Sequence, residues 1–216
     1  MVAGHGFFEH CQLFLCCLSN EQVGAKLSPP VIEGKDGEGE AVLGAAKLML
    51  AAARTAPKTA GVDDILTLIV YGEEKDAIAG RMEEMAEERK IEGFRRDAKN
   101  VRDSHAVVLI AVRGNRSLGL NCGGCGYEGC REFDEADKRV GKDFVGPTCL
   151  FKALDLGIAL GSAAKTASLL DVDNRIMYRI GTAASKLGLL PEASIIMGIP
   201  VSARGKNIYF DRPVKV

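Results

Sequence analysis

The stretch AARTAPKTAGVDDILTLIVYGEEKDAI, Ala52 to Ile78, contains the boundaries of several elements of secondary structure. The strong helix formers before and within its start are interrupted by Pro57 and Gly61, both of which break helices. Ile65–Tyr71 is an apolar, β-branched run with the length of a strand. The charged residues that follow open an amphipathic pattern. The stretch therefore predicts the order helix, loop, strand, helix.

The same alternation continues on both sides of this stretch. Strong helix formers or helical spacing of apolar residues predict four helices, at 41–54, 73–90, Leu150 to about Leu170, and Asn174 to about Leu187 with Asp173 as its cap. Two further apolar runs predict buried strands at Ala106–Val112 and Ala193–Val201. Alternating helices and strands indicate an α/β or α+β fold, and the chain of 216 residues suits one main core.

Residues 1–40 differ from the rest and are expected to form an extension and linker with little order. The segment EGKDGEGE, residues 33–40, combines glycines with charges as linkers do. The domain is then expected to span residues 41–216. The extension also contains three cysteines, which either bind a second metal with a histidine or are small apolar residues without a site: Cys11, Cys16 and Cys17, with His5 or His10.

The overall charge excludes several classes of partner. With 28 Lys and Arg against 29 Asp and Glu, the formal net charge is −1. A chain of this charge offers no basic field to nucleic acid or to an anionic membrane surface. The apolar segment near the N-terminus is interrupted by charge and is too short to span a bilayer, which needs about 20 residues. We expect neither nucleic acid nor a membrane as a partner.

Thiols are concentrated in the stretch NCGGCGYEGC, Asn121 to Cys130, where three cysteines and four glycines occupy ten positions. The spacing is Cys122-x2-Cys125-x4-Cys130, and Cys149 follows later in the chain. Four thiolates are the ligand set of one iron–sulfur cluster or of one tetrahedral zinc ion. Clustered cysteines, an odd total of seven and no secretory signal favour metal ligation in a reducing compartment, the cytoplasm.

Glycines around these cysteines favour the cluster over zinc. Glycine lets the backbone wrap closely around a cluster and turn its N–H groups toward sulfur. Structural zinc sites usually consist of two short cysteine pairs, whereas three of the ligands here lie together. We expect one 4Fe–4S cluster in preference to a 2Fe–2S cluster. Zinc and plain buried thiols stay as the alternatives.

Two resemblances carry this reading further. The motif NCGGCGYEGC with the later Cys149 resembles the four-cysteine iron–sulfur module of the corrinoid iron–sulfur protein and of the B subunit of the Rnf electron-transport complex. In those modules a proline usually follows the last cysteine, whereas here Pro147 precedes Cys149. Over about residues 40–214 the chain also resembles a prokaryotic family of uncharacterised proteins described as containing a ferredoxin domain, with segments such as MGIPVSARGKNIYFDR.

The stretch quoted first resembles the flavin-dependent nitroreductases, whose helix ends in Ala-x-x-Ala-Pro-Ser before a cofactor loop and a strand. DLGIALGSAAKTASLL resembles their long central helix. The resemblance implies an α+β, three-layer fold with a mostly antiparallel central sheet, here with a cysteine-rich insertion at about 114–149. It also implies a homodimer that pairs through the central helix. The nitroreductase Asn-x-Gln-Pro-Trp is replaced by Gly61-Val62-Asp63-Asp64-Ile65, and the Arg-Arg-Ser opening is not recognisable.

The nitroreductase resemblance further implies an FMN site. Its residues would be Arg54, Thr55, Pro57 and Lys58 in the loop, with Arg204 and Lys206 from the tail near the phosphate. Each has an alternative role. Arg54 and Lys58 suit the C-terminal end of a helix, where cations meet the last carbonyl groups, and the tail cations suit a solvated surface.

Two function classes remain. The first is an iron–sulfur redox protein that exchanges electrons with a flavin or a partner protein, with a flavin-dependent oxidoreductase as its enzymatic form. The second is a non-enzymatic protein whose metal only clamps the insertion. A domain of this size needs no metal to fold, which favours the redox class. Catalytic residues stay unassigned because no triad or nucleotide loop can be assembled, and His105 suits a strand edge better than a general base.

Overall fold

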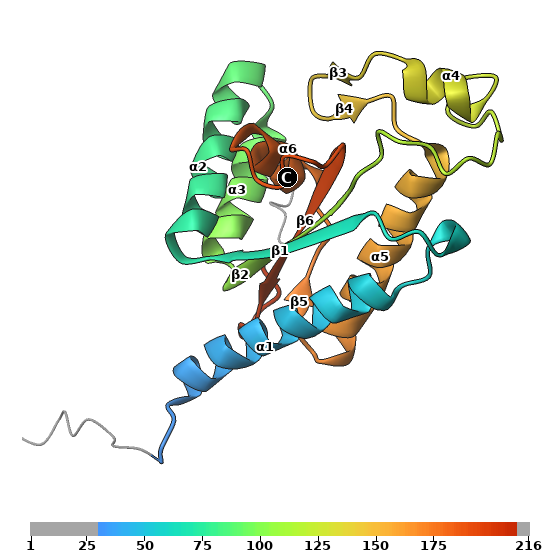
Figure 1. Ribbon diagram of the computed structural model, residues 1–216. Coiled ribbons are helices and arrows are strands. Elements are labelled where there is room, and N and C mark those ends of the chain that lie inside the picture. The colour runs from blue at the N-terminus through green and yellow to red at the C-terminus, as the bar shows by residue number, and fades with distance from the viewer. Residues whose placement is uncertain (1–29, 211–216) are drawn as a thin grey trace, which may run out of the picture. The chain divides into compact units, whose positions relative to one another are not determined.

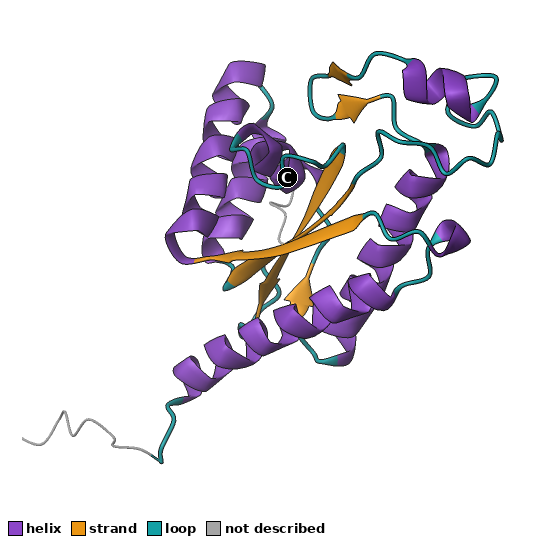
Figure 2. Ribbon diagram, viewed as in Figure 1, coloured by secondary structure: helices purple, strands orange, loops and turns teal. Residues whose placement is uncertain are grey.

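The computed structural model describes residues 30–210, and the chain divides into the units 1–34 and 35–216. The larger unit has a four-stranded sheet between two layers of helices (Figures 1 and 2). This arrangement confirms the expected α+β, three-layer architecture. The cysteines and histidines considered in residues 1–29 lie outside the described residues. The low order expected for that segment concerns the same residues and stays a prediction.

The sheet is antiparallel throughout and has the strand order β1-β2-β6-β5. Its strands are β1 (Ile65–Tyr71), β2 (Ala106–Val112), β5 (Asp173–Asn174) and β6 (Ile195–Ser202). Every residue of β2 is buried, because this strand lies inside the sheet with helices over both faces. An apolar run without alternation is therefore what this position requires.

The register defines two ends of the sheet. Val112 pairs with Ile65 and with Ile195 at what we call the Val112 end. Ala106 pairs with Tyr71 and with Val201 at the opposite end, the Ala106 end. The length of β2 separates the two ends, roughly 20 Å at about 3.3 Å per residue.

Two hydrophobic cores flank the sheet, one on each face. On one face lie α1 (Gly34–Thr55) and α5 (Leu150–Leu169). On the other lie α2 (Gly72–Arg89), α3 (Glu92–Asp103) and α6 (Tyr178–Lys186). In both cores, residues at helical spacing pack on one face of the strands. None of the helices in the described part of the chain combines the length and the hydropathy required to traverse a lipid bilayer.

Several predicted elements are confirmed closely. The strands expected at Ile65–Tyr71 and Ala106–Val112 occur with those bounds, and the helix expected from Leu150 ends at Leu169. The linker expected over 33–40 is wrong, since α1 already begins at Gly34. The buried stripe that starts at Val42 fixes the helix, and extending an existing helix costs little compared with starting one.

Two other local predictions are also wrong. Asp173 does not cap a helix: it lies in β5 and pairs with Ser202 of β6. The helix expected from Asn174 begins only at Tyr178. Sheet pairing therefore overrides the capping tendency of this Asp. The helix α3 was not expected, because its many charged residues mask the apolar face formed by Phe94, Ala98 and Val101.

The insertion begins after β2 and ends at the start of α5. It lies at the upper right of Figure 1. It contains the short helix α4 (Cys130–Glu135) and the hairpin of β3 (Arg139–Val140) and β4 (Val145–Gly146). A turn of 3-10 helix, η1 (Thr59–Gly61), follows α1. The insertion and this turn both belong to the Val112 end of the sheet.

Candidate metal centre

The two ends of the insertion meet beside the sheet. The backbone N–H of Cys149 donates to the carbonyl oxygen of Gly114 at 2.9 Å, and the backbone N–H of Gly114 donates to the Ser194 hydroxyl at 2.9 Å. A Cβ on Gly114 would lie 2.4 Å from both the Ser194 Oγ and the Thr148 Cγ2. Only glycine allows this close approach, which closes the excursion at its base.

The four motif cysteines line one cavity between the loops of the insertion and the first turn of α5. Cys149 is buried, Cys125 and Cys130 are half-buried, and Cys122 is exposed. In the part of the chain that the structure describes, none of the four forms a disulfide. The remaining wall is largely apolar: Leu118, Leu120, Phe133, Leu150 and Phe151. Segments 19 residues apart in the chain thus present their thiols to the same space, and Cys149, which lies farthest from the others in sequence, is among them.

Asn121 connects the two ends of the cysteine loop. Its backbone N–H donates to the Cys130 Sγ at 3.2 Å, and its side-chain oxygen accepts from the Cys130 backbone N–H at 2.9 Å. Asn121 has a φ of 46°, and Gly123 and Gly126 have φ of 69° and 89°. These left-handed conformations let the loop turn tightly, with the Gly126 N–H donating to the Gly123 carbonyl at 3.0 Å.

Ser117 holds the start of the insertion against α4. Its backbone N–H and its hydroxyl each donate to the Asp134 carboxylate at 2.7 Å. Hydrogen bonds from the Asn121 backbone N–H and from the Gly119 backbone hold the pKa of Cys130 below its usual range. A lowered pKa favours the thiolate, which is the form that ligates metals.

Buried charges fix the base of the site. Lys152, one turn after Cys149, lies 2.5 Å from the Asp64 carboxylate, and the Lys152 side chain is 5% exposed. The buried Asp155 carboxylate accepts from the Thr59 backbone N–H at 3.0 Å and from the Thr59 hydroxyl at 2.9 Å. These contacts fasten the loop after α1 to the first turns of α5. Sequence reasoning missed this pair of contacts, as it missed Asn121.

The donor set fits an iron–sulfur cluster. Four thiols line one cavity, a backbone N–H is directed at sulfur, and apolar side chains form the rest of the wall. Within residues 30–210 no three His, Cys, Asp or Glu side chains are arranged around a point that could hold a single metal ion. The thiols therefore share a cavity without converging on one point.

The loop residues expected at an FMN phosphate have protein partners in this structure. Arg54 donates to the Asp63 carboxylate at 2.5 Å and to the Ile65 carbonyl at 2.8 Å. Lys58 donates to the carbonyls of Ala53, at 3.2 Å, and of Arg54. Lys58 thus occupies the capping role that was the alternative, whereas Arg54 pairs with Asp63 and with β1 instead of with the last carbonyls of α1. The Thr55 hydroxyl donates back to Ala51 at 3.1 Å, and Pro57 follows the end of α1.

The two predicted sets of flavin residues lie at opposite ends of the sheet. Arg54 contacts Ile65 at the Val112 end. Arg204 follows β6 at the Ala106 end, where it donates to the Asp103 carbonyl at 2.7 Å, and Lys206 lies two residues further on. One chain therefore does not bring both sets to a single phosphate, and the set stays a prediction that requires two copies.

The chain matches one family model and one archaeal protein. Residues 145–212 match the family described as "Uncharacterized protein containing a ferredoxin domain (DUF2148)". A protein of Archaeoglobus fulgidus, described as uncharacterized, is 51% identical over 185 residues, which cover 86% of this chain and 99% of that protein.

Solved structures show the same architecture at low identity. The nitroreductase CinD from Lactococcus lactis, in complex with nicotinic acid, has a TM-score of 0.52 and 14% identity, with 83% of each chain covered. A putative nitroreductase in complex with FMN from Desulfovibrio desulfuricans has a TM-score of 0.48 and 14% identity, covering 86% of this chain and 82% of that chain. The fold is nitroreductase-like, as expected.

Proposed function

Because the chain belongs to the family of uncharacterized proteins containing a ferredoxin domain, we propose that it is an iron–sulfur redox protein that holds one 4Fe–4S cluster. The family and the fold together indicate a redox role. The observation that carries the proposal is the shared cavity of Cys122, Cys125, Cys130 and Cys149. The alternative is a non-enzymatic protein whose metal only clamps the insertion. The experiment at the end of this section distinguishes the two.

The protein groups around the cavity suit this role. A bound cluster supplies reversible one-electron transfer, and hydrogen bonds to sulfur and burial tune its potential. Asn121 provides such a hydrogen bond to Cys130, while Phe133 and Leu150 exclude water from part of the wall. Cys122 is exposed, so we place the approach of a partner protein on its side. Thiols free of disulfides suit a reducing compartment, and we propose the cytoplasm.

We do not propose an FMN site formed by a single chain. Arg54 and Lys58 would have to leave Asp63 and the last carbonyls of α1 before they could meet a phosphate. Arg204 and Lys206 lie too far away to help from the same chain. An FMN site, and a flavin-dependent oxidoreductase, therefore depend on the second copy and on a rearrangement of these ion pairs.

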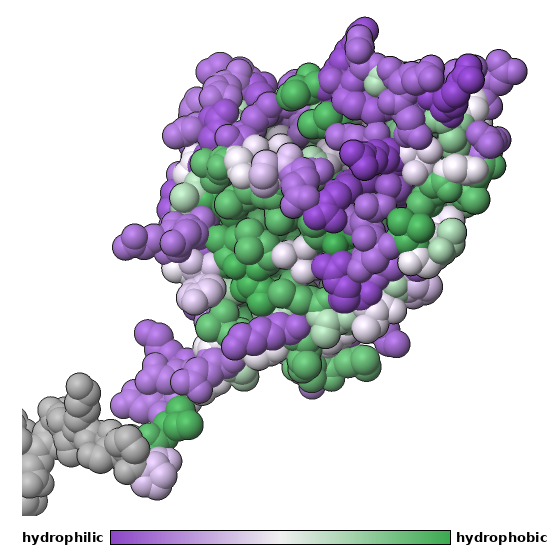
Figure 3. Space-filling view, in the orientation of Figure 1, coloured by the Kyte–Doolittle hydropathy of each residue, from purple (hydrophilic) through white to green (hydrophobic). Residues whose placement is uncertain are grey.

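We propose that the second copy pairs through α5. Large apolar side chains are exposed along one stripe of this helix: Leu150 (40%), Leu154 (51%) and Ile158 (44%). Gly157 and Gly161 lie in the same stripe, and a Cβ on either would meet no atom of residues 30–210 within 4 Å. Hydrophobic side chains also gather over the edge strand β1 in Figure 3. An exposed apolar helix and an unpaired edge strand are features that a homodimer covers.

Reversible redox chemistry tests the proposal. Protein purified without oxygen should be brown, bleach with dithionite, and recover its colour on reoxidation. Cys125→Ser should abolish the chromophore, whereas Cys16→Ser, outside the motif, should leave it unchanged. A colourless protein whose Cys125→Ser variant loses zinc would instead support the structural clamp.

A further inference from the structure

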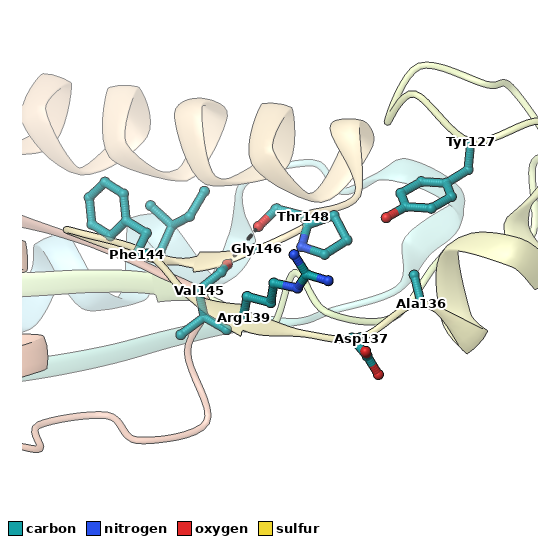
Figure 4. Close-up of a pocket in the computed structure, with 11 residues that line it drawn as sticks. Tyr127, Ala136, Asp137, Arg139, Phe144, Val145, Gly146 and Thr148 are labelled. Atoms are coloured by element: carbon teal, nitrogen blue, oxygen red, sulfur yellow. Dashed lines mark hydrogen bonds between the residues drawn. The ribbon is translucent and has the colours of Figure 1, made fainter.

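A second cavity, of ≈ 660 Å³, lies between the β3–β4 hairpin and the cysteine loop (Figure 4). Small-molecule sites usually enclose about 300–1,000 Å³. The cavity lies within the insertion and the start of β6, and it includes none of the four motif cysteines. Its size and position therefore make it a candidate ligand site beside the metal centre.

The walls of this cavity are held in place by protein contacts. At the tip of the hairpin, Arg89 of α2 forms an ion pair with Asp143 and donates to the Lys142 carbonyl at 3.1 Å. On the returning strand, the backbone N–H of Val145 donates to the Ser194 carbonyl at 3.0 Å. The contacts at the hairpin tip and on β4 hold the hairpin in position, so the cavity is present without a ligand.

Arg139 supplies a cation to the cavity. Figure 4 shows its guanidinium directed into the space below Thr148, with the Tyr127 hydroxyl facing it from the other side and the Asp137 carboxylate turned away. Over residues 30–210, no carboxylate pairs with Arg139, whereas Arg89 and Arg113 each have one. A guanidinium without a carboxylate partner, at the wall of a cavity, suits an anionic group in planar contact.

One side of the wall is apolar and partly aromatic. Phe144 packs edge-on against Tyr178, with ring centroids 6.5 Å apart, and Pro147 and Ile195 complete this side. An apolar body could rest here while its charged group reaches Arg139. We propose that this cavity binds a small organic carboxylate with an aromatic or other apolar ring, held by Arg139 and Tyr127.

The proposed ligand site adjoins the candidate metal centre at two places. The Tyr127 ring packs edge-on against Phe133, with centroids 5.8 Å apart, and Phe133 also lines the cysteine cavity. Thr148, at the cavity wall, immediately precedes Cys149. A bound carboxylate would therefore perturb the surroundings of a cluster, and this consequence rests on the proposed function.

Benzoate is a suitable probe, with benzamide as its neutral counterpart. Calorimetry on the anaerobically purified chain should show saturable benzoate binding at millimolar concentration and weaker binding of benzamide. Arg139→Gln should weaken benzoate binding about tenfold, the effect of one charge-assisted contact. Arg116→Gln is the matched control, because Arg116 belongs to the same insertion but lines neither cavity.

Two readouts separate the ligand site from the cluster. Calorimetry reports benzoate binding whatever metal the chain holds, and electron paramagnetic resonance of the reduced protein reports the cluster and its response to benzoate. Binding that depends on Arg139 supports the ligand site even where no cluster signal is found. A cluster-containing protein that does not bind benzoate, or that binds it equally well with Arg139→Gln, overturns the ligand site alone.

Discussion

Asn121 and Cys130 are joined by two reciprocal hydrogen bonds: the Asn121 N–H donates to the Cys130 Sγ at 3.2 Å, and the Cys130 N–H donates to the Asn121 side-chain oxygen at 2.9 Å. Asn121→Ala removes the second bond and places alanine at a φ of 46°. We expect a loss of about 2 kcal/mol of unfolding free energy, from the hydrogen bond and the left-handed backbone.

Asn121→Gly is the matched variant, since glycine adopts the same φ without strain. It should lose only about 1 kcal/mol, and both variants should keep the backbone N–H bond to sulfur. Anaerobic denaturant unfolding measures both values. Equal losses in the two variants would show that the left-handed backbone of Asn121 does not contribute.

The α5 face should govern assembly. Gly161→Arg places a long cation where a Cβ meets nothing among residues 30–210, so the fold should persist while a homodimer dissociates. Sedimentation at micromolar concentration should report a dimer for wild type and a monomer for Gly161→Arg. Ala77→Arg, on the exposed face of α2, should remain dimeric. A monomeric wild type would contradict the proposed pairing.

His105 should make stability depend on pH. Its Nδ1 is buried and has no hydrogen-bond partner among the described residues, and burial, then the Arg204 charge, lower its pKa below the usual value near 6.5. Lys75 also lowers this pKa, while Glu38 opposes the shift. The neutral ring thus belongs to the folded state, and its contribution is complete above about pH 6.5 and is lost as pH falls through the folded pKa.

Unfolding free energies from pH 8 to pH 5 measure this effect. Wild type should lose more stability on acidification than His105→Gln, with an extra slope of at most about 1.4 kcal/mol per pH unit from one proton. Other titrating groups are common to both proteins and cancel in the difference. Parallel curves would mean that His105 titrates alike in the folded and unfolded chain.

Asp63 should oppose flavin binding. It forms an ion pair with Arg54 at 2.5 Å and lies 3.8 Å from the Lys58 Nζ, so it competes with a phosphate for both cations. We expect weak FMN binding by wild type and roughly tenfold tighter binding by Asp63→Asn. Glu74→Gln, with the same charge change on α2, is the control for calorimetry. An affinity that does not improve with Asp63→Asn argues against a phosphate at this loop.

The sequence predicted β1 and β2 because both are short apolar runs rich in β-branched residues, with the length of a strand. It located all four thiols of the candidate site because their spacing is itself the chemical signal. The helix α3 escaped prediction, since only Phe94, Ala98 and Val101 mark its apolar face among many charges.

Contacts between distant segments could not be predicted. Lys152 and Asp64 are 88 residues apart, and nothing local to either one identifies the other as its partner. The alternative roles of Arg54 and Lys58 likewise depended on where Asp63 and the last carbonyls of α1 lie in space. Local sequence patterns specify elements and ligand types, whereas burial and ion pairing are decided by the packed chain.

Iron and acid-labile sulfide content test the central claim most directly. The chain should be purified and analysed without exposure to oxygen, with zinc measured in the same sample. One 4Fe–4S cluster in the cavity of Cys122, Cys125, Cys130 and Cys149 predicts four iron and four sulfide per chain, with no stoichiometric zinc. One zinc per chain without sulfide would contradict the account.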